Sequence, residues 1–175
     1  MGRGTRGMEE LLIVDGYNMI GAWPKLTELK KNELGRARDQ LLEILSEYRV
    51  YSGVKILVIF DAHQVPGMGK KIKRYKVDIY YTKENETADE MIERLVKKWR
   101  SRKVQITVAT SDYTEQRISF GYGALRKSAR ELLEDIEKAK KSIRKTAEQI
   151  KYEPLKTGIP LKSDIAELFE KWRRE

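Results

Sequence analysis

The sequence predicts an α/β fold, a three-layer sandwich of the Rossmann-like type with a mostly parallel central sheet and C-terminal helices. Two observations support this. Short apolar segments rich in β-branched residues alternate with longer segments whose apolar residues recur at helical spacing. Strands that alternate with helices form βαβ units, which join parallel strands through right-handed crossovers. A chain of 175 residues is also long enough to bury one hydrophobic core.

Four strands are predicted, and each contains few polar residues, as strands buried on both faces of a parallel sheet do. In chain order they cover residues 11–14, 54–60, 77–81 and 104–109. The third is the weakest of the four. Together they predict the central layer of the sandwich.

The predicted helices lie between and after these strands. One helix ends at Gly53 and joins the first two strands, and another begins at about Thr87. A long charged helix begins with a capping box formed by Ser128 and Glu131. A last short helix around residues 165–172 is expected to pack back on the domain.

The expected domain organisation follows from these elements. Residues 1–9, rich in Gly and Arg, form a flexible N-terminal extension. Residues 10–125 form the α/β domain, and residues 126–175 form a helical extension packed on that domain.

Composition restricts the classes of function. The net charge of +9 and the pI of about 9.6 favour a polyanionic partner, and RNA is the leading class. The chain has no cysteine and one histidine, which excludes disulfides and thiolate zinc sites and disfavours a His-rich zinc site or a Ser-His triad. No apolar segment approaches the roughly 18 residues of a membrane span, and no signal-peptide pattern is present. We expect a cytoplasmic protein without a small-molecule cofactor.

Aspartates follow three of the predicted strands. Asp15 and Asp61 come directly after a strand, and Asp112 lies just beyond another. The carboxyl ends of parallel strands meet at one edge of a sheet, which is where α/β folds bind ligands. Asp89, in the first turn of a predicted helix, is in phase with the apolar stripe that faces the sheet.

Structural explanations exist for the same residues. Thr87 and Glu90 fit a capping box, and strand-terminal aspartates often initiate turns. The convergence of four carboxylates favours a functional role for them over a purely structural one. Carboxylates that crowd together repel one another unless a cation neutralises them. Mg²⁺ prefers oxygen ligands, and Mn²⁺ can substitute for it. One or two such ions bound in a protein can catalyse the hydrolysis of a phosphodiester bond.

The residues around these aspartates resemble the NYN domain of the PIN-like nucleases. The motifs, in chain order, are Asp15-Gly16-Tyr17-Asn18, Phe60-Asp61-Ala62-His63, Thr87-Ala88-Asp89-Glu90 and Thr110-Ser111-Asp112. The stretches 18–24, 82–90, 111–116 and 123–131 look like the bacterial YacP-type branch of that family. The similarity covers most of the chain from about Glu10.

The resemblance implies a PIN-like fold and a metal-dependent ribonuclease. The YacP-type branch implies an endoribonuclease that cuts mRNA on the translating ribosome, within the A site. The match assigns metal binding and catalysis to Asp15, Asp61, Asp89 and Asp112. It makes Asn18 an orienting or substrate-contacting side chain.

The sequence departs from the family pattern at one position. Many NYN domains have a second aspartate two residues after the last one, where this chain has Thr114 followed by Glu115. Glu115 is a candidate for an outer-shell carboxylate. His63 either reaches a phosphate or makes a local hydrogen bond, and the sequence leaves both readings open.

Two basic clusters are candidates for RNA binding. The first lies in residues 70–76, which we predict to be a mobile loop, and the second lies at the start of the long helix. Their members are Lys70, Lys71, Lys73 and Arg74 in the first, and Arg126, Lys127 and Arg130 in the second. Such contacts hold phosphates without reading sequence, and Tyr17 or Tyr75 is expected to stack an unpaired base. The alternative for residues 70–76 is a solvated loop without function.

The sequence leaves two other functions to consider. One is a binding module with a PIN-like fold that docks on RNA or the ribosome without cleaving. The other is a nucleotide or phosphate-transfer enzyme, which the sequence disfavours because it lacks a Gly-rich phosphate loop that ends in Lys-Ser/Thr. An aspartyl phosphatase usually has a second aspartate where this chain has Tyr17.

Overall fold

The computed structural model describes residues 9–61, 71–74, 76–99, 103–113, 116–117 and 121–152. The chain divides into two compact units, Met1–Glu134 and Asp135–Glu175. The first unit contains the sheet and the helices that cover it, and the boundary falls within helix α6, Ala129–Tyr152. The short helix predicted around residues 165–172 and the extension before residue 9 lie outside the described residues.

The described residues form a six-stranded sheet with the order β3-β4-β2-β1-β5-β6. The strands are β1 (Glu9–Asp15), β2 (Lys55–Phe60), β3 (Lys71–Arg74), β4 (Val77–Tyr81), β5 (Val104–Ala109) and β6 (Leu125–Lys127). All neighbours pair in parallel except β3 and β4, which are antiparallel. The predicted mostly parallel α/β sheet is therefore confirmed, together with its four strands.

The two edge strands correct the sequence-based expectations. Lys71–Arg74, expected in a mobile loop, pairs with β4 as strand β3, and Lys76 has a φ of 62° in the turn between them. Its alternation of basic residues with Ile72 is a strand pattern, but four residues are too few to reveal it in the sequence. Arg126 and Lys127, expected at the start of the long helix, instead form the end of β6.

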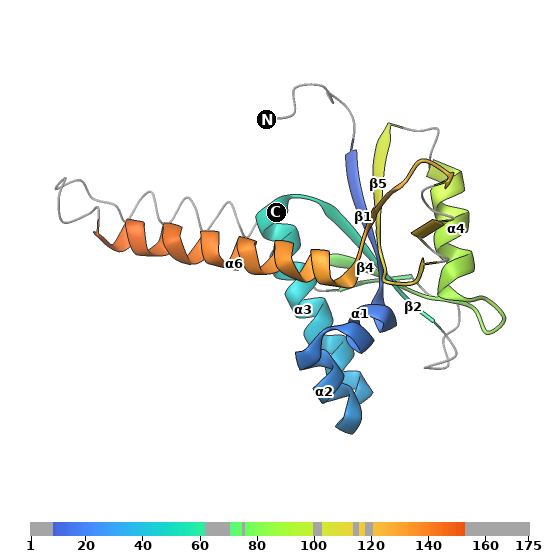
Figure 1. The fold of residues 1–175 in the computed structure, drawn as a ribbon, viewed down its shortest axis with the longest axis horizontal. Coiled ribbons are helices and arrows are strands. Elements are labelled where there is room, and N and C mark those ends of the chain that lie inside the picture. The colour runs from blue at the N-terminus through green and yellow to red at the C-terminus, as the bar shows by residue number, and fades with distance from the viewer. Residues whose placement is uncertain are drawn as a thin grey trace. The chain divides into compact units, whose positions relative to one another are not determined.

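Helices cover both faces of the sheet (Figure 1). They are α1 (Gly16–Ala22), α3 (Leu34–Ser52) and α4 (Ala88–Trp99), while α2 (Pro24–Asn32) packs on α1 and α3. Ile13, Leu57 and Val108 pack in one core cluster with residues of α4. Alternate residues of the strands face the opposite side, where α1 and α3 lie. The left-handed Gly53, with a φ of 74°, ends α3 as predicted.

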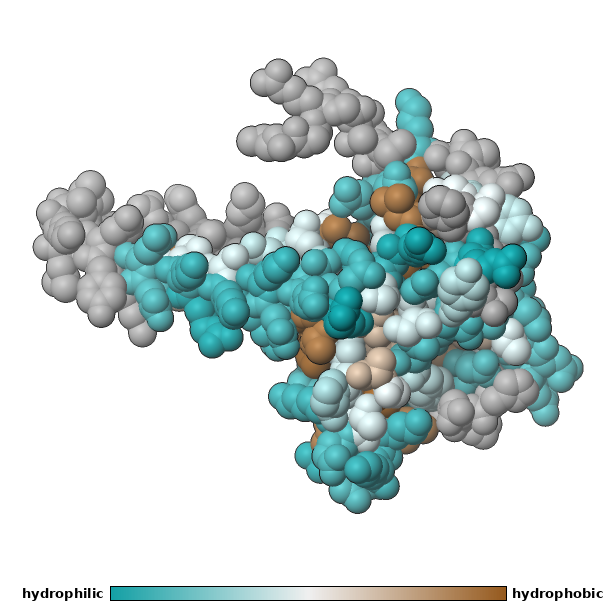
Figure 2. Space-filling model, in the orientation of Figure 1, coloured by the Kyte–Doolittle hydropathy of each residue, from teal (hydrophilic) through white to brown (hydrophobic). Residues whose placement is uncertain are grey.

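The described part of the second unit runs from Asp135 to Tyr152 and is the remainder of α6. Most of its side chains are exposed, and the α6 surface that faces the viewer in Figure 2 is predominantly hydrophilic. Within the described ranges, no helix has both the length and the apolar character that a bilayer span requires.

A close approach between the first helix and the second strand organises the carboxyl edge of the sheet. Gly16 begins α1 directly after Asp15, and a Cβ at this position would overlap the ring of Phe60, with Cδ1 only 2.6 Å away. Phe60 is fully buried, and its ring centroid lies 5.0 Å from that of Tyr17 and 5.5 Å from that of Tyr81. The turn after β1 therefore requires a residue without a side chain.

We expect Gly16→Ala to lower the free energy of unfolding by about 1–3 kcal/mol, because the added methyl group must displace a buried aromatic ring or the backbone. Gly21→Ala is the matched control in the same helix, since a Cβ there meets no atom within 4 Å. Alanine also favours helix, so this control should be neutral or slightly stabilising. Urea unfolding followed by circular dichroism measures both variants. Equal stabilities would show that Phe60 does not constrain the turn.

Candidate active site

The register of the parallel strands brings acidic residues to one edge of the sheet. Asp15 is the last residue of β1, and its Cα pairs with that of Ile59 in β2. Asp61 follows the end of β2, and Asp112 lies three residues beyond β5, the other neighbour of β1. The central strand and its two neighbours thus each end at a candidate carboxylate.

The fourth carboxylate reaches this edge from a helix. Asp89 lies in the first turn of α4, and the backbone N–H of Ala88 donates a 3.3 Å hydrogen bond to Oδ2 of Asp61. Asp61 thereby holds the start of α4 beside the end of β2. The backbone N–H of Glu90 donates to Oγ1 of Thr87 at 3.2 Å, so the predicted helix-capping role of Thr87 is confirmed.

The four carboxylates influence one another electrostatically. The pKa of Asp15 is raised from 3.8 to about 6. Burial is the largest cause, the charges of Asp112 and Asp61 act in the same direction, and the Asn18 backbone and the Thr110 hydroxyl act in the opposite direction. Asp89 is exposed, and its pKa is also raised from 3.8 to about 6, by partial desolvation first and then by the charges of Asp112, Asp15 and Asp61. The edge of the sheet therefore concentrates negative charge.

The donor set fits a hydrated divalent cation. Its donors are carboxylate oxygens, which Mg²⁺ prefers, and the mutual repulsion of the carboxylates is what a cation relieves. Across the described part of the chain, no three acidic or histidine side chains are close enough together to ligate a single ion. Mg²⁺ in proteins commonly takes one or two carboxylates and completes its shell with water and substrate phosphate. Asp15, Asp61, Asp89 and Asp112 are the residues that would hold such a cation.

A buried threonine connects two of the acidic residues. The Thr110 hydroxyl donates to Oδ2 of Asp15 at 3.4 Å and accepts from the backbone N–H of Asp112 at 3.1 Å. The Thr110 N–H donates to the carbonyl of Lys127, which joins the loop after β5 to β6. Thr110 was not singled out as a site residue, although a hydroxyl two residues before Asp112 was a usable signal.

Asn18 acts on the same loop. Its Oδ1 accepts a 2.7 Å hydrogen bond from the backbone N–H of Ser111, while its own backbone lowers the pKa of Asp15. Of the two roles that the sequence left open, this geometry supports the orienting one. The side-chain amide nitrogen of Asn18 does not take part in these bonds.

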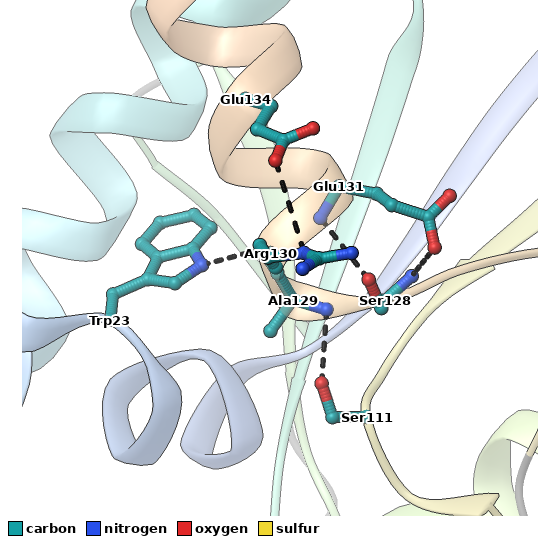
Figure 3. A network of polar contacts seen from close by, with 7 residues as sticks. All are labelled: Trp23, Ser111, Ser128, Ala129, Arg130, Glu131 and Glu134. Atoms are coloured by element: carbon teal, nitrogen blue, oxygen red, sulfur yellow. Dashed lines mark hydrogen bonds and ion pairs between the residues drawn. The ribbon is translucent and has the colours of Figure 1, made fainter.

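The loop after β5 is also tied to the start of α6 (Figure 3). Oγ of Ser111 accepts from the backbone N–H of Ala129 at 3.0 Å, and Nε1 of Trp23 donates to the Ala129 carbonyl at 2.8 Å. Ser128 and Glu131 exchange hydrogen bonds of 3.1 and 3.3 Å between side chain and backbone, which confirms the predicted capping box. Segments more than 100 residues apart in the sequence thus fix the position of the loop that carries Asp112.

The predicted RNA-binding residues are distributed around this edge. Tyr17 is half-buried against Phe60, and its hydroxyl accepts a 3.2 Å hydrogen bond from Nη1 of Arg38, a residue that the sequence did not single out. Arg126 is exposed on β6 and Lys127 is half-buried there. Arg130, in the first turn of α6, is exposed and lies 3.8 Å from Glu134.

Part of the first basic cluster lies on an edge strand. Lys71, Lys73 and Arg74 lie on β3, at the β4 edge of the sheet. The residues His63, Lys70, Tyr75, Thr114 and Glu115 lie outside the described residues.

Comparison with known proteins gives concordant matches. The family model described as YacP-like NYN domain matches residues 12–174. The chain is 50% identical over 165 residues to the uncharacterized protein YacP of Bacillus subtilis (strain 168), a match that covers 94% of this chain and 97% of that protein. The crystal structure of Rae1 (YacP) from Bacillus subtilis matches with a TM-score of 0.70 and 50% identity over 94% of each chain. A crystal structure of a mutant of that protein matches with a TM-score of 0.72 and 48% identity over 81% of this chain and 84% of that chain.

We expect Asp15→Asn to stabilise the metal-free protein at neutral pH. The pKa of Asp15 rises from 3.8 in the unfolded chain to about 6 in the fold, so its ionised form destabilises the folded state. This destabilisation is absent below pH 4, grows between pH 4 and 6 and is complete above pH 6. The free energy of unfolding of Asp15→Asn should therefore exceed that of the wild type by about 1–3 kcal/mol at pH 7.5 and equal it at pH 4.

Urea unfolding in EDTA at the two pH values measures this difference. Asp39→Asn, which removes an exposed carboxylate from α3, is the control and should change stability little at either pH. If the wild type were as stable as Asp15→Asn at pH 7.5, the ionised Asp15 carboxylate would not destabilise the fold as proposed.

Proposed function

The chain belongs to the YacP-like NYN domain family, and from this premise we propose that it is a Mg²⁺-dependent endoribonuclease that cleaves mRNA within the ribosomal A site during translation. Membership of this family implies a nuclease-like function. The observation that carries the proposal further is the convergence of Asp15, Asp61, Asp89 and Asp112 on one edge of the sheet, where their charges interact. Such an edge is where a divalent cation and an RNA phosphate can meet.

The residues of the site have separable tasks in this proposal. The four aspartates would hold the cation, and Mn²⁺ could replace Mg²⁺ there. When bound, the cation supplies positive charge that offsets the negative charge of the phosphodiester during hydrolysis. The Thr110 hydroxyl is hydrogen-bonded to the carboxylate of Asp15 and helps to orient it. The Asn18 side chain holds the loop that precedes Asp112.

Charge supports the choice of RNA and the ribosome as partners. The net charge of +9 favours association with polyanions, and both mRNA and ribosomal RNA are polyanions. Arg126 and Arg130 are exposed close to the loop that carries Asp112, because β6 and the start of α6 are hydrogen-bonded to that loop. The A site and a cytoplasmic location rest on the resemblance to the YacP-type branch.

One observation favours a second candidate, a non-catalytic RNA- or ribosome-binding module with the same fold. Among the described residues, no preassembled group of three ligands surrounds a single cation position. A module of this kind would keep the basic residues and use the carboxylates only to shape the edge. Activity is what separates the two candidates.

We expect Asp15→Asn and Asp89→Asn to abolish cleavage of a translated mRNA on purified ribosomes while ribosome co-sedimentation persists. Loss of an outer-shell partner commonly lowers metal affinity or activity about 10–100-fold, so loss of a direct ligand should lower activity about 100-fold or more. Asp39→Asn should retain activity. Ribosomes need Mg²⁺ themselves, so a parallel reaction on naked RNA with Mg²⁺, Mn²⁺ or EDTA tests the metal requirement. Cleavage retained by both aspartate variants would contradict the site, and a wild type that binds ribosomes without cutting would favour the binding module.

A further inference from the structure

One guanidinium group lies beside the candidate active site and is bonded to a phenol. Arg38 extends from α3, and its Nη1 donates to the hydroxyl of Tyr17 at 3.2 Å. Tyr17 follows Asp15 by two residues, and its side chain interacts electrostatically with both Arg38 and Asp61. The side chain of Arg38 is half-buried. The positively charged Arg38 guanidinium is therefore held next to the carboxylate edge.

Other arginines of the first unit form ion pairs with carboxylates, as surface arginines usually do. Arg36, one half-turn away on the same helix, lies 3.7 Å from Glu33, and Arg94 lies 2.8 Å from Glu86. Within the described ranges, Arg38 has no carboxylate partner, and the Tyr17 hydroxyl is its hydrogen-bond acceptor. A guanidinium has five N–H donors, so one bond to a phenol leaves most of its capacity unused.

The group that holds Arg38 is itself rigidly placed. The ring of Tyr17 packs on Phe60 at a centroid distance of 5.0 Å, and Phe60 stacks on Tyr81. Tyr17 accepts the hydrogen bond from Arg38, so its own hydroxyl proton is available to a second acceptor. The packing and the bond make Tyr17 an anchor for Arg38.

We propose that Arg38 and Tyr17 form a phosphate-binding subsite, which holds an RNA phosphodiester next to the one at the carboxylates, on the β2 and β4 side of the edge. The naming of RNA as the ligand rests on the proposed function. A guanidinium matches a phosphate with two parallel N–H···O bonds, and the Tyr17 hydroxyl adds a third donor. Because the subsite is separate from the carboxylates, it contributes to RNA binding even where no cleavage occurs.

The test is binding of a fluorescein-labelled, single-stranded RNA of about 12 nucleotides, a length within the usual site sizes, measured by anisotropy over a range of KCl concentrations. All proteins carry Asp15→Asn, so that the probe stays intact. Arg38→Ala should weaken binding roughly fivefold at low salt, the size of one partly exposed ion pair. It should also reduce the slope of log K against log salt by about 0.7, the value for one lost contact to a single-stranded phosphate.

Arg36→Ala is the matched control, because it removes the same charge from the same helix at a position already paired with Glu33. It should leave affinity and slope close to those of the parent. Arg38→Lys should recover part of the affinity, since it restores the charge without the planar fork. Tyr17→Phe should weaken binding, and adding it to Arg38→Ala should change little, because the two residues act as one unit.

The outcomes separate the subsite from the proposed function. Equal binding by the Arg38→Ala and Arg36→Ala proteins, or a loss of affinity without a change in salt slope, would overturn the subsite. An RNA in which methylphosphonates replace the phosphates should bind the Arg38→Ala protein and its parent equally. If the Arg38 effects appear while the protein with Asp15 intact cuts no RNA, the subsite stands and the nuclease proposal fails.

Discussion

The concentration of carboxylates at one edge of the sheet is the constraint on which the rest of the site depends. Burial and neighbouring charge raise the pKa of both Asp15 and Asp89 to about 6, so their ionised forms oppose folding. The fold tolerates this because donors surround the edge. The Thr110 hydroxyl donates to Asp15 and the N–H group of Ala88 donates to Asp61. In the proposed function, a divalent cation bound at this edge would relieve the repulsion between the carboxylates.

The geometry of this edge is maintained by contacts between segments that are distant in the chain. Asn18 bonds to Ser111, 93 residues away, and Ser111 bonds in turn to the start of α6. Trp23 reaches the Ala129 carbonyl across 106 residues. The loop that carries Asp112 is therefore placed by α1 and by the beginning of α6, and not by β5 alone. This explains why polar residues without direct chemistry accompany the aspartates in the motifs.

Much of the fold was predictable because its signals are local. The apolar segments of β1, β2, β4 and β5, the left-handed glycine after α3 and the capping box of α6 all act within a few residues. The edge strand β3 and the three-residue β6 were not predicted, since each exists only through pairing with a neighbour. The short helix α1 was missed for a related reason: it contains two glycines, and it is stabilised by buried contacts of Met19 and Ile20 rather than by helix propensity.

The sequence by itself determined which carboxylates could meet, because parallel strands place their carboxyl ends at one edge and helical phase brings Asp89 toward it. Only the tertiary structure decided how that edge is arranged. It assigned the Asn18 side chain to Ser111, gave Thr110 a place between Asp15 and Asp112, and left Arg38 bonded to a phenol instead of a carboxylate. The physical reason is that a hydrogen bond depends on distances of a few tenths of an ångström, which the whole path of the chain determines.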